Sequence, residues 1–147
     1  MSRAEFYKLV FGENEMAASW LRDEERIVMR EPFTSLLIMG EDRIHGVVVF
    51  NNKTDNNIEL SFSGVGLVTR RIIRFICAYC FIDNGCLRIT CRTNANNERA
   101  IEAMTRIGFV LEGCMRNYYG KDDALIFGLL KNECTIWNKS NASTTTH

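Results

Sequence analysis

The sequence predicts an α+β protein whose central mixed β-sheet carries helices on its faces. Two observations lead to this prediction. Short segments in which apolar and polar residues alternate recur along the chain, and such alternation is typical of strands. These strands surround two well-spaced apolar segments of helical period, at residues 67–83 and 97–107. This order of elements favours one mixed sheet with the helices packed against it.

The N-terminal half shows five predicted elements. They are a strand at 6–11, a helix at 13–26, and strands at 34–39, 44–50 and 58–63. The helix has Met16, Trp20 and Ile27 on one face, which predicts the side that packs against the sheet. A polar loop at 51–57 separates the strand at 44–50 from the strand at 58–63. The residues of the strand at 58–63 alternate between two faces.

The C-terminal half also shows five predicted elements. They are a helix at 67–83, a strand at 87–93, a helix that Asn96 or Asn97 begins and Gly108 ends, and strands at 109–118 and 124–130. Asn84 and Gly85 end the first helix. In the second helix, Glu98 and Arg106 complement the helix dipole at its two ends. A turn at 120–123 joins the last two strands.

Composition limits the function. The chain has 147 residues, and we expect one domain over 1–137 followed by a disordered polar tail over 138–147. Eighteen basic and eighteen acidic residues cancel, which argues against bulk attraction to nucleic acid or to a membrane. No apolar run approaches the ~18–20 residues that span a bilayer, and the N-terminus lacks the apolar core of a secretion signal. We therefore expect a cytoplasmic protein.

Six cysteines occur in the chain, and we expect them to be reduced. Cys77 and Cys80 have the C-x-x-C spacing of redox and zinc motifs. They fall inside an apolar helical segment, however, where small core residues are the simpler interpretation. No second pair has zinc-finger spacing, and His45 and His147 are poorly placed as ligands. We therefore expect no metal.

A glycine-containing turn between residues 58–63 and the helix at 67–83 is the most informative feature for function. It reads Gly64-Val65-Gly66, and Arg70, Arg71 and Arg74 crowd the first turns of the helix that follows. Cations are unfavourable at a helix N-terminus, which already carries partial positive charge. The arrangement is explained if a polyanion docks there, because glycine lets backbone N–H groups approach phosphate oxygens. We interpret the turn as a site for a phosphorylated cofactor.

A second motif lies downstream. Residues 93–101 read TNANNERAI and are followed by RIGF at 106–109. This order resembles the Asn-x-x-(Ser/Ala)-Ile…Gly-Phe motif of the GNAT superfamily of N-acetyltransferases, and especially its ribosomal-protein-alanine acetyltransferase branch. The closing hairpin is also similar, at Glu112, Gly113, Arg116, Gly120, Asp123, Leu129 and Leu130. The resemblance covers about residues 33–133, and the compact size is similar to short GNAT domains of bacteriophages.

The resemblance implies that two parallel strands splay apart and that acetyl-CoA, a co-substrate, lies in the gap. Its pantetheine arm would pair with the strand that contains Ser61, Phe62 and Ser63. Its pyrophosphate would lie on the backbone amides of the next six residues, which are Gly64, Val65, Gly66, Leu67, Val68 and Thr69. Arg70, Arg71 or Arg74 would then touch phosphates, and Asn97 would both cap its helix and reach toward the pantetheine.

Three positions depart from the family pattern. Ser63 replaces a long polar residue at the start of the phosphate loop, and Val68 replaces a small one. Met104 stands where many relatives have a tyrosine that protonates the leaving thiolate, although the alanine-acetyltransferase branch often has an aliphatic residue there. These departures keep a second interpretation open, in which the chain is a GNAT-like protein-binding module with weak or no turnover.

Acyl transfer to an amine needs a base for the amine and a proton for the leaving sulfur. Glu59, on the predicted cleft strand, is the candidate base, with a solvent-facing carboxylate as the alternative. Tyr118 or Tyr119 is the candidate acid, with hairpin packing as the alternative for each. A cysteine nucleophile is disfavoured because no Cys–His spacing suggests an activated pair.

The acceptor follows less directly from the sequence. A protein N-terminus, a lysine or a small amine fits the chemistry, and an α-amine needs the least help because its pKa is about 8 against about 10.4 for lysine. Nucleic-acid binding is a further alternative, disfavoured because aromatic interleaving is lacking. It would use arginines spread over several elements, namely Arg70, Arg71, Arg74, Arg88, Arg92, Arg99 and Arg106. The sequence leaves the oligomeric state open, with a homodimer as one option.

Overall fold

The computed structural model describes residues 7–64 and 69–134, and these form two compact units. The described part of unit 1 comprises residues 7–52 and 60–64, and that of unit 2 comprises residues 53–59 and 69–134. Seven strands run in the order β1-β2-β3-β4-β5-β7-β6. The predicted α+β class with a mixed sheet is confirmed. No helix in these described residues is long and apolar enough to cross a bilayer.

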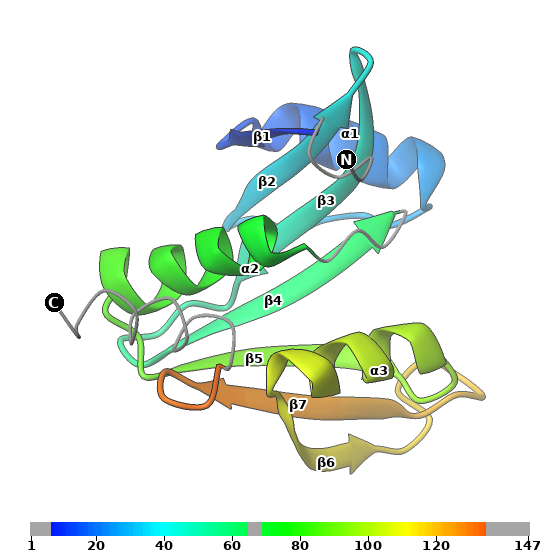
Figure 1. Cartoon of the computed structure of the whole chain (residues 1–147). Helices are drawn as coiled ribbons and strands as arrows, with labels where there is room; N and C mark the ends of the chain where they lie inside the picture. The colour runs from blue at the N-terminus through cyan, green and yellow to red at the C-terminus, as the bar shows by residue number, and fades with distance from the viewer. Residues whose placement is uncertain (1–6, 65–68, 135–147) are drawn as a thin grey trace, which may run out of the picture. The chain divides into compact units, whose positions relative to one another are not determined.

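The helices and strands follow the predicted order (Figure 1). They are β1 (Lys8–Phe11), α1 (Asn14–Glu24), β2 (Phe33–Gly40), β3 (Arg43–Asn51), β4 (Asn57–Gly64), α2 (Arg70–Cys77), a π-helical segment η2 (Ala78–Asp83), β5 (Arg88–Asn94), α3 (Glu98–Ile107), β6 (Val110–Met115) and β7 (Ala124–Leu130). β4 contributes to both units, because its residues up to Glu59 belong to unit 2 and those from Leu60 onward to unit 1.

In unit 1, antiparallel strands β1, β2 and β3 present one apolar face to α1 (Figure 1). Ala17 and Leu21 of α1 pack with Leu37 of β2 and with Val47 and Val49 of β3, and all five are almost fully buried. The spacing of four residues puts both α1 side chains on one face of the helix. Burial of these side chains holds α1 on the sheet.

Gly64, at the end of β4, is required by its surroundings within unit 1. Its φ is +111°, a conformation that favours glycine. A Cβ atom at this position would lie 2.5 Å from the carbonyl oxygen of His45 and 2.7 Å from the Cα of Gly46. The backbone of β3 therefore leaves no room for a side chain here, and this explains the glycine independently of any ligand.

In unit 2, β5 and β6 flank β7 in antiparallel pairs. The first residues of β4 lie beside β5, because the amide of Leu87 donates to the carbonyl oxygen of Asn56 at 2.9 Å and the Thr90 hydroxyl donates to Asn57 Oδ1 at 2.6 Å. These contacts advance in the same direction along both segments, as in a parallel pair. The same unit also holds α2, η2 and α3.

Thr69 caps α2, and its Oγ1 accepts from the Ile72 amide at 3.2 Å. The predicted helix at 67–83 therefore starts at Arg70, while Leu67 and Val68 lie outside the described residues. Its last turns are π-helical, and Asn84 ends them as predicted. The buried side chains of this segment are Ile72, Ile73, Ile76, Cys77, Cys80 and Phe81.

The C-terminal elements also match their predictions, with one correction. Asn97 caps α3 by accepting from the Ala100 amide at 3.2 Å, and Gly108 ends the helix at φ +121°. β7 has the predicted bounds, but β6 ends at Met115 and does not reach residue 118. Asn117 takes φ +56° and donates its amide to Asp123 Oδ1 at 2.8 Å, so the chain turns before the predicted end of the strand.

Candidate functional site

One face of β5 carries a row of polar side chains. Residues at every second position, Arg88, Thr90, Arg92 and Asn94, are half-buried and polar, while the alternate residues Ile89, Cys91 and Thr93 are buried. A strand places successive side chains on opposite faces. Unit 2 therefore has one apolar and one polar side along this strand, and each polar side chain has a partner from another segment of the same unit.

Arg92 connects two of the residues for which the sequence predicted catalytic roles. Its Nη2 lies 3.1 Å from Glu59 Oε1 on β4. Its Nη1 donates to the Tyr118 hydroxyl oxygen at 2.5 Å, and its guanidinium carbon lies 4.7 Å from the centre of the Tyr118 ring. Since one guanidinium contacts both groups, the structure brings the predicted base and one predicted acid together.

Glu59 is the most enclosed of these groups, with 12% of its side chain exposed against 27% for Arg92. A carboxylate this enclosed loses much of its hydration, and it is kept only where another charge or hydrogen-bond donors compensate. Arg92 supplies a charge at hydrogen-bond distance. Glu59 is therefore not the solvent-facing strand carboxylate that the sequence left as an alternative.

The connection between β6 and β7 holds Tyr118 and Tyr119. Asp122 anchors it to the end of β5, since it accepts from the side-chain amide of Asn94 at 3.1 Å and from that of Asn96 at 2.8 Å. The amide of Tyr119 donates to the Asp122 carbonyl oxygen at 3.0 Å. The sequence predicted a turn at 120–123, and Asp122 ties that turn to the end of the strand that carries Arg92.

The two tyrosines differ in their surroundings. Their rings lie edge to face with centres 4.9 Å apart, and each is a little under half exposed. Arg92 contacts the Tyr118 oxygen, whereas desolvation by burial raises the pKa of Tyr119, an effect that Arg92 partly opposes. The Tyr118 oxygen thus accepts a hydrogen bond from a charged guanidinium. Its own O–H group can therefore donate to another acceptor.

Cys91 lies on the buried side of β5. Burial, reinforced by the negative charge of Glu59, raises the pKa of its thiol to about 12. The thiolate is the nucleophilic form of cysteine, so this residue is protonated and unreactive near neutral pH. None of the six cysteines forms a disulfide, and no cluster of histidine, cysteine and carboxylate side chains in residues 7–64 and 69–134 is suited to a metal ion.

A second arginine–carboxylate pair lies on the same side of β5. Arg88 Nη2 and Glu112 Oε1 are 2.6 Å apart. The pair passes over Gly128 of β7, where an added Cβ would meet Glu112 Oε2 and, at 2.5 Å, Arg88 Nη2. This pair has no tyrosine on its guanidinium among the described contacts, and it gives a matched comparison for Arg92 and Glu59.

The residues predicted to bind acetyl-CoA fall in separate parts of the structure. Ser61, Phe62, Ser63 and Gly64 belong to unit 1, while Thr69, Arg70, Arg71 and Asn97 belong to unit 2. Val65, Gly66, Leu67 and Val68 lie outside the described residues. Thr69 and Asn97 are helix caps, as described above. The predicted roles of all these residues in binding acetyl-CoA stay predictions.

The N-terminus of α2 is basic, as the sequence indicated. Arg70, Arg71 and Arg74 are all exposed, and the first turn of α2 contains no acidic residue. Two positive charges therefore add to the partial positive charge of the first helical turn. The chemistry of this segment suits a phosphate group, because exposed guanidinium groups bind phosphate oxygens through charge-assisted hydrogen bonds.

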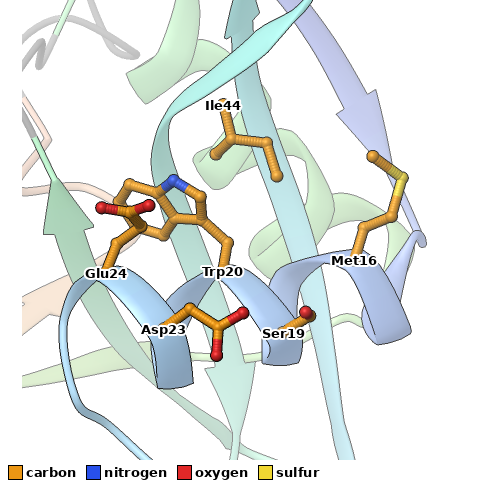
Figure 2. Close-up of a pocket in the computed structure, with 6 residues that line it drawn as sticks. All are labelled: Met16, Ser19, Trp20, Asp23, Glu24 and Ile44. Carbon is orange, nitrogen blue, oxygen red and sulfur yellow. The ribbon is translucent and has the colours of Figure 1, made fainter.

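Unit 1 has a surface hollow of its own, of about 310 Å³ (Figure 2). Met16, Ser19, Trp20, Asp23 and Glu24 of α1 line it together with Ile44 of β3. Both carboxylates line the same hollow as the indole ring. An aromatic ring beside carboxylates suits a cation better than an anion.

Sequence analysis missed Arg92, which it considered only as one of several arginines for nucleic-acid binding. The signal was present in the alternation of β5, which puts Arg92 on the polar face with Asn94, and in that of β4, which separates Glu59 from Asn57 by two positions. Three of the arginines in that interpretation, Arg88, Arg92 and Arg106, form ion pairs with Glu112, Glu59 and Glu102. Their charges are therefore partly neutralised within the protein.

Comparison with models of protein families gave no match, and comparison with curated proteins gave none either. Solved structures do match. A variant of SpeG, a spermidine N-acetyltransferase from Vibrio cholerae, superposes with a TM-score of 0.73 at 14% identity, over 92% of this chain and 99% of that one. A GCN5-related N-acetyltransferase from Brucella melitensis gives 0.61 at 20% identity, over 75% of this chain and 56% of that one.

A third solved structure matches with a TM-score of 0.63 at 17% identity. This chain spans only 60% of the length of that protein. Likeness at such identities shows the fold. The chain has the fold of the GNAT acetyltransferases, and the predicted fold class is confirmed. The ribosomal-protein-alanine branch and the bacteriophage type stay predictions.

Proposed function

We propose that the protein is an acetyl-CoA-dependent N-acetyltransferase that moves an acetyl group directly to a primary amine. The observation that carries this proposal is the arrangement of Glu59 and Tyr118 on the guanidinium of Arg92. It puts a proton acceptor and a proton donor on one side of unit 2, in a fold that acetyltransferases share. We further propose that residues 1–137 act as a single domain and that the protein works in the cytoplasm.

The reaction requires two proton movements. The unprotonated amine nitrogen attacks the thioester carbonyl carbon, and Glu59 takes the proton that the nitrogen loses, either directly or through a water molecule. A C–N bond forms as the C–S bond breaks, and the leaving sulfur takes the hydroxyl proton of Tyr118. Direct transfer is favoured over an acyl-cysteine intermediate because burial keeps the Cys91 thiol protonated, with a pKa raised to about 12.

Acetyl-CoA is the donor in this proposal, and the chemistry of the described residues suits it. The exposed Arg70 and Arg71, at the end of α2 that Thr69 caps, would bind its phosphates. The backbone of Ser61–Ser63 would pair with the pantetheine arm. No step of the proton chemistry depends on these residues, so their contribution appears in donor binding alone.

The acceptor is proposed to be a protein N-terminus or a lysine, with a small polyamine as the alternative. An α-amine, with a pKa of about 8, is partly unprotonated at neutral pH and asks least of Glu59. The polyamine is favoured by the matching spermidine N-acetyltransferase, and by the cation-suited hollow that Trp20, Asp23 and Glu24 line in unit 1. Another matching structure of that enzyme is described as dodecameric, and we propose a homo-oligomer, with a dimer as the minimal form.

Two measurements test the function. Millimolar acetyl-CoA should raise the Tm, since a ligand that binds only the folded state stabilises it. Acetyl-CoA mixed with an amine should release free thiol, measured with a thiol-reactive dye. The amines to compare are a peptide with a free α-amine, an N-terminally blocked peptide with one lysine, and spermidine. A blocked peptide without lysine is the control.

The outcomes separate the two interpretations of the sequence. Thiol release above the control with any of the three amines supports the enzyme. A rise in Tm without thiol release supports a GNAT-like module that binds the donor but does not turn over, which the buried Met104 at the position of the usual tyrosine favours. The absence of both a rise in Tm and thiol release would contradict the proposal.

A further inference from the structure

We propose that Cys77 and Cys134 form a site of reversible oxidation, at which a low-molecular-weight disulfide such as glutathione disulfide converts the two thiols into one protein disulfide. This chemistry is independent of the proposed acetyl transfer. The observation that carries it is the contact between the two sulfur atoms, which lie 3.5 Å apart although the residues are 57 positions apart in the chain. Both side chains are fully buried within unit 2.

The partner of Cys77 differs from the one that the sequence suggested. The C-x-x-C spacing pointed to Cys80, which lies three positions further along, where α2 has passed into η2. In the structure the Cys77 thiol instead donates to the Cys134 sulfur. The motif therefore provides one half of a thiol pair, and the segment that follows β7 provides the other half.

The chain folds back after β7, and this places Cys134 beside α2. The Glu133 amide donates to the Leu130 carbonyl oxygen at 2.9 Å, and the Leu130 amide donates to Glu133 Oε1 at 3.0 Å. The Glu133 carbonyl oxygen also lies so close to Gly108, at the end of α3, that a Cβ atom there would collide with it. These contacts restrain the residue next to Cys134, so the packing of unit 2 itself brings the two sulfurs together.

A small movement separates this contact from a covalent bond. The S–S bond of a disulfide is about 2.05 Å long, so the two sulfurs would approach by roughly 1.5 Å. Rotation of the two short side chains about χ1 can supply a shift of this size. The bond would close a loop that contains β5, α3, β6 and β7. Closing so long a loop restricts the unfolded chain strongly and thereby favours the folded state.

The reaction is a thiol–disulfide exchange in two steps. One protein thiolate attacks a sulfur of glutathione disulfide, which forms a mixed disulfide and releases one glutathione. The second protein thiolate then attacks the protein sulfur of the mixed disulfide. This attack forms the bond between Cys77 and Cys134 and releases the second glutathione. In total, two electrons and two protons pass from the protein thiols to the two glutathione molecules.

The folded protein protects the pair from rapid exchange. The hydrogen bond with Cys134 and burial raise the pKa of the Cys77 thiol, so the thiolate that attacks disulfides is scarce near neutral pH. Exchange therefore needs a local opening that exposes one of the two thiols. We expect oxidation and reduction to take minutes to hours, the range of uncatalysed disulfide exchange.

The first test measures the equilibrium of the exchange. Full-length protein is kept in buffers with fixed ratios of glutathione to glutathione disulfide, and the free thiols are then alkylated for mass spectrometry. One sample starts as reduced folded protein and another is refolded from urea in the same buffer, so equal oxidised fractions show that equilibrium is reached. The equilibrium constant for the disulfide should be about 100-fold larger in folded protein than in urea-unfolded protein. Equal constants would overturn the inference.

Peptide mapping identifies the bonded residues. Trypsin, which cuts after lysine and arginine, releases Cys77 in fragment 75–88 and Cys134 in fragment 132–139. The disulfide should join these two fragments. Because fragment 75–88 contains further cysteines, Cys77→Ala should lose the joined fragments, whereas Cys80→Ala, the matched control in the same buried segment, should keep them. A bond confined to fragment 75–88, or joined fragments that persist in Cys77→Ala, would overturn the inference.

Urea unfolding of the wild type gives a readout that needs no variant and no enzyme activity. The oxidised protein should unfold at a higher urea concentration than the reduced protein, because the bond fits the folded structure and restricts the unfolded chain. A phosphine reductant should abolish this difference. An oxidised protein that unfolds at the same urea concentration as the reduced protein, or at a lower one, would overturn the inference even if Cys77→Ala fails to fold.

Discussion

Arg92 and Glu59 form an ion pair of 3.1 Å between β5 and β4, and both side chains are largely buried. Two charges this enclosed are costly to desolvate, so such a pair is weak evidence for stability by itself. Because the same guanidinium also contacts Tyr118, we interpret the pair as part of the candidate site. A proton acceptor and a proton donor share one cation, which is the arrangement that the proposed proton transfers use.

Glu59→Gln tests the carboxylate. The amide has the same size but cannot accept a proton, so kcat should fall about 100-fold or more while the KM for acetyl-CoA stays within about twofold. Initial rates of thiol release measure both parameters. Glu102→Gln is the matched control, because Glu102 also pairs with an arginine at 2.8 Å but lies exposed on α3. Full activity in Glu59→Gln would remove this residue from the proposed chemistry.

Tyr118→Phe and Tyr119→Phe separate the two candidate acids. Only the Tyr118 oxygen contacts Arg92, so its loss should lower kcat by about 10- to 100-fold. Tyr119→Phe keeps the ring-to-ring contact of 4.9 Å and should change kcat less than about threefold. Steady-state kinetics of the two variants, which differ by one oxygen atom each, decide the assignment. The reverse ranking would transfer the role of acid to Tyr119.

Arg70→Glu and Arg71→Glu test the donor end of the site. Each replaces an exposed cation at the start of α2 by an anion, which the helix dipole itself tolerates well. Folding should therefore be preserved or slightly improved, whereas phosphate binding should weaken and raise the KM for acetyl-CoA about tenfold. Arg22→Glu, on α1 in unit 1, is the control for a change of net charge. Equal KM values in all three variants would leave the arginines without a role in donor binding.

Helix and strand positions were largely predictable because local patterns determine them. Asn97 and Gly108 bound α3 as predicted, since caps act through hydrogen bonds within a few residues. The end of β6 was not predictable. Asp123 holds the amide of Asn117 in a turn six residues upstream, and no local propensity reports such a contact.

The site was predictable only in part. Glu59 and Tyr118 followed from chemistry and resemblance, but their common partner did not, because Arg92 and Tyr118 are 26 residues apart in the chain. Gly64 was assigned to phosphate binding, although the backbone of β3 alone explains why it must be glycine. A sequence pattern reports that a residue is special, and only packing shows whether a ligand or a neighbour makes it so.

Asn97→Ala tests a residue with two proposed roles. Loss of the cap on α3 should reduce the free energy of unfolding by about 1 kcal/mol, because the Ala100 amide loses its acceptor. Urea unfolding measures this loss. If Asn97 also contacts the pantetheine arm, the KM for acetyl-CoA should rise about fivefold in the same variant. Asn97→Asp keeps a capping oxygen and should restore stability, so a KM that stays high in it identifies the second role.

Because burial raises the pKa of its buried cysteines, we expect the protein to lose stability at alkaline pH. Burial raises the pKa of Cys91 from its ordinary value of 9.0 to about 12, and that of Cys80 likewise to about 12. Above pH 9 the unfolded chain releases these protons while the folded protein keeps them. The unfolded state then binds fewer protons than the folded state. The free energy of unfolding therefore falls as the pH rises from 9.0 to about 12, and these thiols leave it unchanged below that range.

Comparison of variants isolates this effect from other titrating groups. Each such thiol should lower the free energy of unfolding by about 1.4 kcal/mol per pH unit within the window. Urea unfolding of Cys91→Ala should therefore give a shallower decline than the wild type above pH 9. Cys114→Ala, at an exposed position, should decline in parallel with the wild type. If Cys91→Ala declines as steeply as the wild type, the thiol is already ionised in the folded protein, and its exclusion as a nucleophile no longer holds.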